Sequence, residues 1–156
     1  MENKQEVIVY AGGTWDLFHI GHLNIFKNAK SLGTKLIIGV NTDELVQRNK
    51  KVTPIIPYEQ RVEIIKSCRY VDEVVKQEDY LKPDEMLKLK VNIIVAGSDW
   101  EGKYLESVEW LKNNTDIKMV YFPYTSGISS TIIKQKLNEF LNQDLEGSFP
   151  NANFKK

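Results

Sequence analysis

The fold of this chain is decided by the stretch Gly13-Thr14-Trp15-Asp16-Leu17-Phe18-His19-Ile20-Gly21-His22, which joins a predicted strand to a predicted helix. Before it, the apolar run Val7-Ile8-Val9-Tyr10 is typical of a buried strand. Ala11-Gly12-Gly13 then permits a tight turn and a close approach of the backbone to a ligand. Residues 21–31 carry apolar side chains at helical spacing, namely Leu23, Ile25, Phe26 and Ala29. The stretch therefore opens a βα unit.

Two histidines stand three residues apart at the end of this stretch. His19 and His22 share one face at or just before the first helical turn. A helix start offers unpaired N–H groups and a dipole that favours anions, so imidazoles there add donors to a phosphate site. Ordinary surface or core histidines are one alternative. A metal site is another, but Cys68 is remote and the chain has no third histidine. Because both histidines follow the glycines, the pattern favours phosphate binding.

The rest of the chain alternates between the two kinds of element. Four further apolar, β-rich runs are predicted to be strands: residues 36–40, 71–75, 93–95 and 119–122. Helical patterns cover residues 21–31, 58–68, 83–89, 105–111 and 130–141. This alternation predicts an α/β fold: a Rossmann-like, doubly wound, parallel five-stranded sheet with helices on both faces. Ligands of such sheets bind at the carboxyl ends of the strands, where the strand order reverses.

Composition limits the classes of function. Lysine and arginine total 21, as do aspartate and glutamate, so no overall charge draws the chain to nucleic acid or to an anionic membrane. A single cysteine, Cys68, excludes an intrachain disulfide and fits a reducing compartment. The sequence shows neither a long apolar segment nor a signal peptide, so we expect a cytoplasmic protein outside the membrane.

The length of 156 residues suits one domain, predicted over residues 1–141. Residues 47–57 contain two prolines and are predicted to form a mobile loop. The tail over residues 142–156 lacks a helical or strand period, and we expect it to be poorly ordered or loosely docked.

Residues 14–22 resemble the signature of the HxGH nucleotidyltransferases, within the cytidylyltransferase family and similar to its glycerol-3-phosphate type. Three further segments carry the resemblance in the family's order, over roughly residues 7–140: Arg69-Tyr70-Val71-Asp72-Glu73-Val74, Gly97-Ser98-Asp99-Trp100-Glu101-Gly102-Lys103 and Thr125-Ser126-Gly127-Ile128-Ser129-Ser130-Thr131. The resemblance implies a single nucleotidyltransferase domain that transfers CMP from CTP to a small phosphorylated alcohol and releases pyrophosphate. Mg²⁺ would arrive with the nucleotide, and the family's usual assembly is a homodimer.

The resemblance also implies roles for individual residues. His19 and His22 would be catalytic, with Asp16 orienting the site. The nucleotide would be bound by Gly12, Gly13, Thr14, Trp15, His19, His22, Gly97, Asp99, Thr125, Gly127, Ile128, Ser129 and Ser130. The acceptor would be bound by Lys50, Lys51, Arg61, Arg69, Asp99 and Trp100. No residue is expected to hold a metal ion directly.

One position departs from the pattern. The glycerol-3-phosphate type has an arginine just before its Thr-Glu-Gly-Ile-Ser segment, and here Tyr124 stands there, while Ser126 replaces the acid. Tyrosine cannot bind phosphate bidentately as a guanidinium does. Lys134, about one helical turn beyond the start of the last predicted helix, is a candidate replacement.

Three alternatives therefore stay open. The acceptor can be a phosphonate, an amino-alcohol phosphate or another small phosphorylated molecule. The nucleotide can be ATP, as in an enzyme that makes a flavin or pantetheine nucleotide. The chain can also be a nucleotide-binding regulator without turnover. An aminoacyl-tRNA synthetase is excluded by the short chain, by the missing Lys-Met-Ser-Lys-Ser loop and by the lack of excess basic charge.

Overall fold

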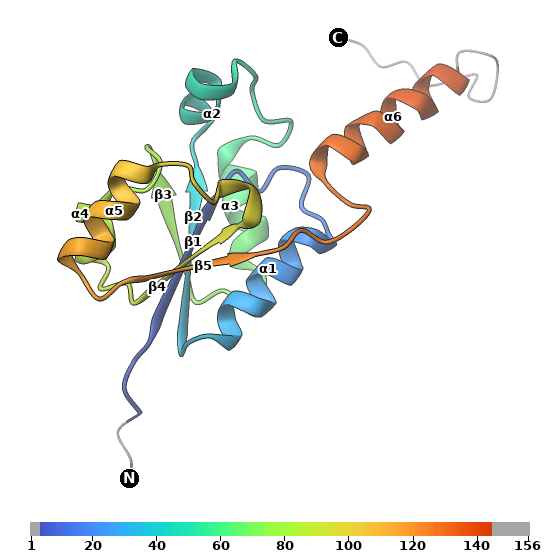
Figure 1. The fold of residues 1–156 in the computed structure, drawn as a ribbon. Coiled ribbons are helices and arrows are strands. Elements are labelled where there is room, and N and C mark those ends of the chain that lie inside the picture. The colour runs from blue at the N-terminus through green and yellow to red at the C-terminus, as the bar shows by residue number, and fades with distance from the viewer. Residues whose placement is uncertain (1–3, 145–156) are drawn as a thin grey trace.

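Parallel strands form one sheet across residues 4–144, the part of the chain that the computed structural model describes (Figure 1). The strands are β1 (Ile8–Gly13), β2 (Lys35–Asn41), β3 (Glu73–Gln77), β4 (Ile93–Gly97) and β5 (Lys118–Phe122). Their order is β3-β2-β1-β4-β5, and every neighbouring pair is parallel. This confirms the predicted five-stranded parallel sheet.

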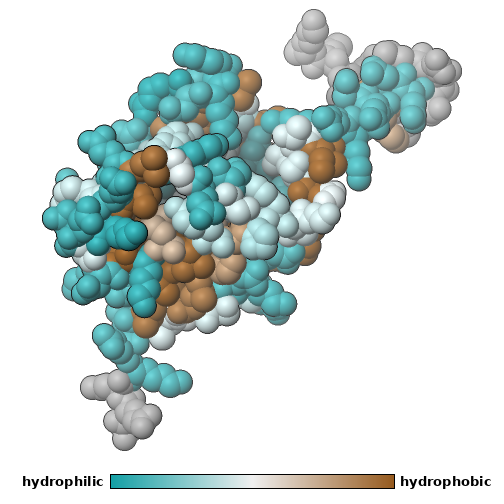
Figure 2. All heavy atoms as spheres, in the orientation of Figure 1, coloured by the Kyte–Doolittle hydropathy of each residue, from teal (hydrophilic) through white to brown (hydrophobic). Residues whose placement is uncertain are grey.

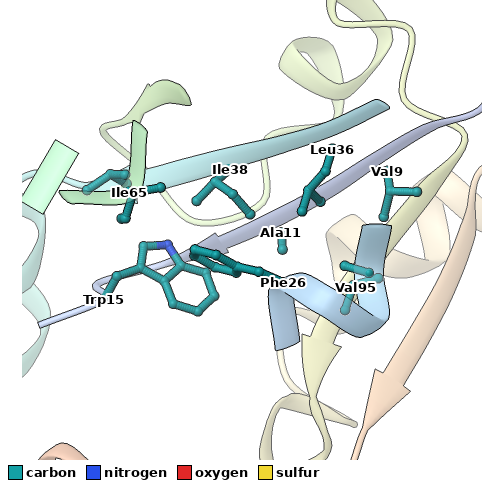
Figure 3. Packing of buried hydrophobic residues seen from close by; sticks show 10 residues of the cluster. Val9, Ala11, Trp15, Phe26, Leu36, Ile38, Ile65 and Val95 are labelled. Carbon is teal, nitrogen blue, oxygen red and sulfur yellow. The ribbon is translucent and has the colours of Figure 1, made fainter. Parts of the chain in front are cut away.

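Helices cover both faces of the sheet. They are α1 (Ile20–Ser31), α2 (Asp43–Lys50), α3 (Tyr58–Lys66), α4 (Pro83–Lys88), α5 (Leu105–Asn114) and α6 (Ser130–Asp144), with a 3-10 turn η1 (Ser98–Trp100). Phe26 of α1 and Ile65 of α3 pack on one face, in the cluster drawn in Figure 3. Met86 of α4 and Leu111 of α5 pack on the other. The doubly wound arrangement is thus confirmed.

The central strand shows why two cores form. Side chains alternate along a strand, so Val9 and Ala11 of β1 enter one core while Ile8 and Tyr10 enter the other. α1 leads from β1 to β2 on one face, whereas β4 continues through α5 on the opposite face. The strand order therefore reverses between β1 and β4, and a cleft is expected at their carboxyl ends.

The turn after β1 differs from the expectation. Gly12 and Gly13 belong to the strand, and the left-handed backbone is found at Trp15 and Leu17, with φ of 57° and 51°. The two glycines are required sterically instead. A Cβ on Gly12 would lie 2.3 Å from Oε1 of Gln77, and one on Gly13 would lie 2.7 Å from the indole of Trp15.

Several element boundaries also differ. α2 replaces the first part of the predicted 47–57 loop, because Thr42 caps it by accepting the N–H of Leu45. β3 begins two residues later than its apolar run, at Glu73. α6 continues to Asp144, past the expected start of the tail, and residues 145–156 lie outside the described residues.

The surface is mixed in character. On the face drawn in Figure 2, hydrophilic side chains cover α2, while hydrophobic residues gather beside α5 and in the lower centre of the view. The exposed apolar residues of α5 are Leu105 and Trp110. Among the described residues, no helix combines the length and the apolar character that a membrane span requires.

Candidate active site

A cleft of about 530 Å³ lies at the carboxyl ends of β1 and β4, a volume typical of small-molecule sites. It brings together most of the residues predicted from the sequence. Those that line it are Gly12, Gly13, Thr14, Trp15, Asp16, His19, His22, Lys50, Gly97, Asp99, Trp100, Thr125, Ile128, Ser129 and Ser130. Lys51, Arg61, Arg69 and Gly127 are not among the lining residues.

The two histidines cap the helix on which they stand. His19 is the N-cap of α1, and its Nδ1 accepts the N–H of Gly21 at 3.0 Å. The Nδ1 of His22 accepts the N–H of His19 at 3.3 Å, which completes a reciprocal capping box. The rings are stacked, with centroids 3.8 Å apart. Since each Nδ1 accepts a hydrogen bond, the proton of each neutral ring is on Nε2. Both rings are therefore Nε2–H donors that line the cleft.

The protonation state of the histidines follows from their surroundings. Burial, together with the neighbouring His19, lowers the pKa of His22 to about 4, and Asp16 partly opposes this shift. Burial also lowers the pKa of His19. Both imidazoles are consequently neutral at pH 7 in the free protein. They offer hydrogen-bond donors rather than fixed positive charge.

This shift makes stability depend on pH. Between pH 6.5 and about 4, the unfolded chain binds a proton at His22 that the folded protein does not. The free energy of unfolding should therefore fall as the pH falls through this window, by roughly 3 kcal/mol in total. Urea titrations at a series of pH values measure the slope. His22→Asn should flatten it, and an unchanged slope in that variant would show that other groups cause it.

Gly21 is required by the ring of His19. A Cβ on Gly21 would lie 2.8 Å from Cε1 and 2.9 Å from Nδ1 of that ring. We expect Gly21→Ala to displace the imidazole and lower kcat by about 100-fold, the scale of a lost transition-state donor. Alanine favours helix by about 1 kcal/mol over glycine, and the lost His19 cap costs about as much, so the melting temperature should change little. Steady-state kinetics together with calorimetry test both parts, and a variant with full activity would contradict the steric argument.

Asp16 positions the segments around the histidines. Its carboxylate accepts the N–H groups of Ile55, Ile56 and Leu17 at 2.8, 2.9 and 3.0 Å. Its backbone carbonyl accepts the hydroxyl of Ser130 at 2.8 Å. Both carboxylate oxygens are engaged, so Asp16 acts by holding the 55–56 segment and the start of α6 against the β1–α1 loop.

The start of α6 forms another wall of the cleft. Ser129 caps the helix, because its hydroxyl accepts the N–H of Ile132 at 3.1 Å. Thr125, just before it, is tied to α1 by a hydrogen bond from Asn24 at 3.0 Å. The first N–H groups of a helix have no partner within it, and Ser129, Ser130 and Thr131 line the cleft. Two helix starts thus face one cavity, an arrangement suited to a polyanion.

Arg61 has a different role from the predicted one. Its side chain is buried, and its guanidinium donates to the carbonyls of Ile56, Thr14 and Asn41 and to the carboxylate of Asp43. It therefore ties together the loops that surround the cleft and is not itself part of the lining.

Arg69 and Lys51 also lie away from the cleft. The exposed guanidinium of Arg69 donates to the Tyr70 hydroxyl. Lys51 ends α2 in a left-handed conformation with φ of 58°.

The charges of the cleft favour anions. Among residues 4–144, Lys50, Lys103 and Lys134 take part in no salt bridge, and all three line the cleft. Two carboxylates, those of Asp16 and Asp99, also line the cleft, so the three lysines outnumber them. Burial and the neighbouring Asp99 carboxylate raise the pKa of Tyr124, so its hydroxyl stays neutral.

A doubly wound sheet with a cleft at its switch point, lined by two helix starts and by lysines, is typical of nucleotide-binding α/β proteins. The chain belongs to the cytidylyltransferase-like family, whose model matches residues 10–136. It is 38% identical over 135 residues to glycerol-3-phosphate cytidylyltransferase of Bacillus subtilis (strain 168), covering 85% of this chain and 97% of that protein. It is 35% identical over 126 residues to FAD synthase of Pyrococcus abyssi (strain GE5 / Orsay), covering 80% and 85%.

The fold is also similar to a solved structure, described as a lipopolysaccharide core biosynthesis protein from Thermoplasma volcanium GSS1. The TM-score is 0.67 at 25% identity, covering 78% of this chain and all of that one. Together the comparisons show that the protein is an enzyme, a nucleotidyltransferase.

Proposed function

We propose that the enzyme transfers CMP from CTP to a small phosphorylated alcohol similar to glycerol 3-phosphate, giving a CDP-alcohol and pyrophosphate. The observation that carries the proposal is the pair of capped histidines, whose Nε2–H groups line the same cleft as the start of α6. The identity to glycerol-3-phosphate cytidylyltransferase over nearly the whole of that protein supports the choice of nucleotide and acceptor.

The chemistry needs donors more than it needs a nucleophile from the protein. An oxygen of the acceptor phosphate forms a bond to the α-phosphorus of CTP while the bond to the bridging oxygen of the β-phosphate breaks. Negative charge moves to the departing pyrophosphate. His19 and His22 would donate to oxygens of the triphosphate as this charge develops, and the start of α6 would bind the leaving group. Lys134 would supply the cation that Tyr124 cannot.

We further propose that Mg²⁺ enters with the nucleotide. Asp16, the carboxylate whose charge acts on His22, already accepts three backbone N–H groups, which hold it to the surrounding loops. Phosphate oxygens and water, which Mg²⁺ prefers, would then hold the ion. Bound in this way, it would neutralise part of the triphosphate charge.

Lys50 is the proposed contact for the acceptor's phosphate, because it lines the cleft and its neighbour Lys51 does not. We expect Lys50→Ala to raise the KM for the acceptor about tenfold and to leave the KM for CTP nearly unchanged. Lys51→Ala is the matched control and should behave like the parent enzyme. An effect of Lys50→Ala on CTP alone would assign this lysine to the nucleotide.

The proposal is tested by pyrophosphate release from the purified protein with Mg²⁺. CTP and ATP are each paired with glycerol 3-phosphate, phosphoethanolamine, phosphocholine, a phosphonate and FMN. Release with CTP and one phosphorylated alcohol supports the proposal and identifies the acceptor. Release with ATP and FMN would support the second candidate, an FAD synthase, which the relative from Pyrococcus abyssi and Tyr124 favour. Binding of CTP without turnover would indicate a regulator.

Two further properties of the enzyme are its oligomeric state and its location in the cell. We propose a homodimer, with the exposed Arg69 and its neighbours up to Val74 contributing to the interface, and sedimentation analysis tests this. We also propose a cytoplasmic enzyme that supplies activated alcohol for a cell-envelope polysaccharide, the use that its proposed product suggests. Fractionation of cells tests the location.

A further inference from the structure

Three aromatic side chains, which we call the aromatic corner, line the end of the cleft beside η1. Tyr80 comes from the loop after β3, Trp100 ends η1, and Tyr104 precedes α5. The Trp100 and Tyr104 rings are stacked with centroids 5.4 Å apart, and Tyr80 lies 5.8 and 5.3 Å from them. Clustered aromatic faces of this kind bind ligand cations, above all quaternary ammonium groups.

In this chain a cation is already present at the corner. The Nζ of Lys103 lies 5.1 Å from the centroid of the Trp100 ring, within the range of a cation–π interaction. Lys103 itself lines the cleft, and within residues 4–144 it forms no salt bridge that would neutralise it. The corner therefore presents a positive charge to whatever enters it.

The carboxylates of the cleft are not paired with Lys103. Asp99 and Asp16 line the cleft, and within residues 4–144 neither forms a salt bridge with this lysine. A ligand with a fixed positive charge that approached the Trp100 ring would therefore meet the Lys103 ammonium already placed on it.

We propose that Lys103 is a specificity-determining residue: its ammonium on the Trp100 ring rejects acceptors with a fixed positive charge and selects phosphorylated alcohols whose organic part is uncharged and rich in hydroxyl groups. The inference rests on the proposed transfer to a phosphorylated alcohol. It adds a statement of which phosphorylated alcohols the enzyme accepts. Specificity of this kind is a difference between affinities, achieved here by a repulsive element.

The experiment compares glycerol 3-phosphate with phosphocholine, a phosphate monoester whose alcohol carries a quaternary ammonium group. For each variant, kcat/KM is measured with CTP for both acceptors. Lys103→Met removes the charge and keeps the length of the chain, so it should shift the ratio of kcat/KM toward phosphocholine by at least about tenfold. Lys103→Arg should keep the parent ratio. Lys112→Met, on α5 and outside the cleft, is the matched control.

A double variant tests whether the ring receives the new ligand. Adding Trp100→Leu to Lys103→Met should abolish the gain for phosphocholine, because the aromatic face is lost. A gain that survives this change would overturn the assignment to Trp100. An unchanged ratio in Lys103→Met would overturn the proposal itself.

Binding measurements separate this inference from the proposed function. The indole resonance of Trp100 in NMR titrations reports binding of both acceptors without any turnover. If the parent enzyme transfers no nucleotide, yet Lys103→Met shifts the ratio of dissociation constants toward phosphocholine tenfold, then the proposed reaction fails and the inference stands. If the parent enzyme is active and neither ratio moves, the inference alone fails.

Discussion

His19→Asn should lower kcat by at least about 100-fold without a measurable loss of stability. The Nδ1 of His19 accepts the N–H of Gly21 and so caps α1, while its Nε2–H is left for the ligand. Asparagine is one of the best N-cap residues, and its Oδ1 takes over the role of Nδ1. It has no donor at the position of Nε2. The same substitution at His22 should lower kcat similarly, but it also removes ring contacts with Trp15 and Phe18 and should lower stability. Single-turnover kinetics isolates the chemical step.

The glutamine variants are the matched controls. Glutamine carries its amide nitrogen close to the position of Nε2 but loses the cap, so His19→Gln should recover part of the rate and unfold at lower urea. A low kcat with unchanged stability in His19→Asn, and a higher kcat with lower stability in His19→Gln, would separate the role of Nε2 in the reaction from the role of Nδ1 as the helix cap. Near-normal kcat in the asparagine variants would refute the role of the histidines as transition-state donors.

Arg61→Met should destabilise the protein by about 3–5 kcal/mol, the cost of breaking a buried charge network. Arg61 is 1% exposed, and its guanidinium donates to three carbonyls within 2.8 Å, those of Thr14, Asn41 and Ile56. The carboxylate of Asp43 is the fourth partner. Methionine fills part of the volume but leaves these acceptors unpaired. The melting temperature should fall by about 10 °C, as measured by calorimetry.

Arg69→Met provides the comparison on the surface. Its guanidinium is exposed and donates to the Tyr70 hydroxyl, so its loss should change the free energy of unfolding by about 0.5 kcal/mol or less. Arg61→Lys keeps the charge and loses the fork of donors, and it should be intermediate. Equal stability of the Arg61 and Arg69 variants would show that the buried network contributes nothing.

The sequence was sufficient for the sheet and for most helices because burial leaves a strong periodic pattern. The apolar runs of β1, β2, β4 and β5 coincide with predicted strands. α2 was missed because only Leu45 and Val46 of its residues are buried, too few to show a period. Its start depends on the Thr42 cap, which a reading of hydrophobic spacing does not detect.

Local sequence predicts the arrangement at the start of α1, whereas the surroundings of Arg61 depend on tertiary contacts. His19, Gly21 and His22 lie within one turn of α1, so their spacing contains the geometry. Arg61 was assigned to the acceptor because its position matches the family's pattern, and nothing around it in the sequence marks burial. Its four partners come from three other segments of the chain, at Thr14, at residues 41–43 and at Ile56.

Lys103 and Tyr80 were missed for a similar reason. Each follows a different strand, and only the parallel sheet brings the two strand ends to one cleft. The predicted parallel sheet, combined with the rule that ligands bind at the carboxyl ends of its strands, would have pointed to both residues.

The central junction of the sheet has a consequence for how the protein folds. β1 pairs with β2 and with β4, and Ile8 and Asn92, which are joined by a hydrogen bond at the second of these junctions, are 84 positions apart. Closing so long a loop costs more entropy than closing the shorter one between β1 and β2, so we expect β4 to dock late in folding. The cleft spans this junction and does not exist before it closes. A triphosphate would therefore bind only the fully folded protein. Its binding during refolding would mark the docking of β4 as the last step.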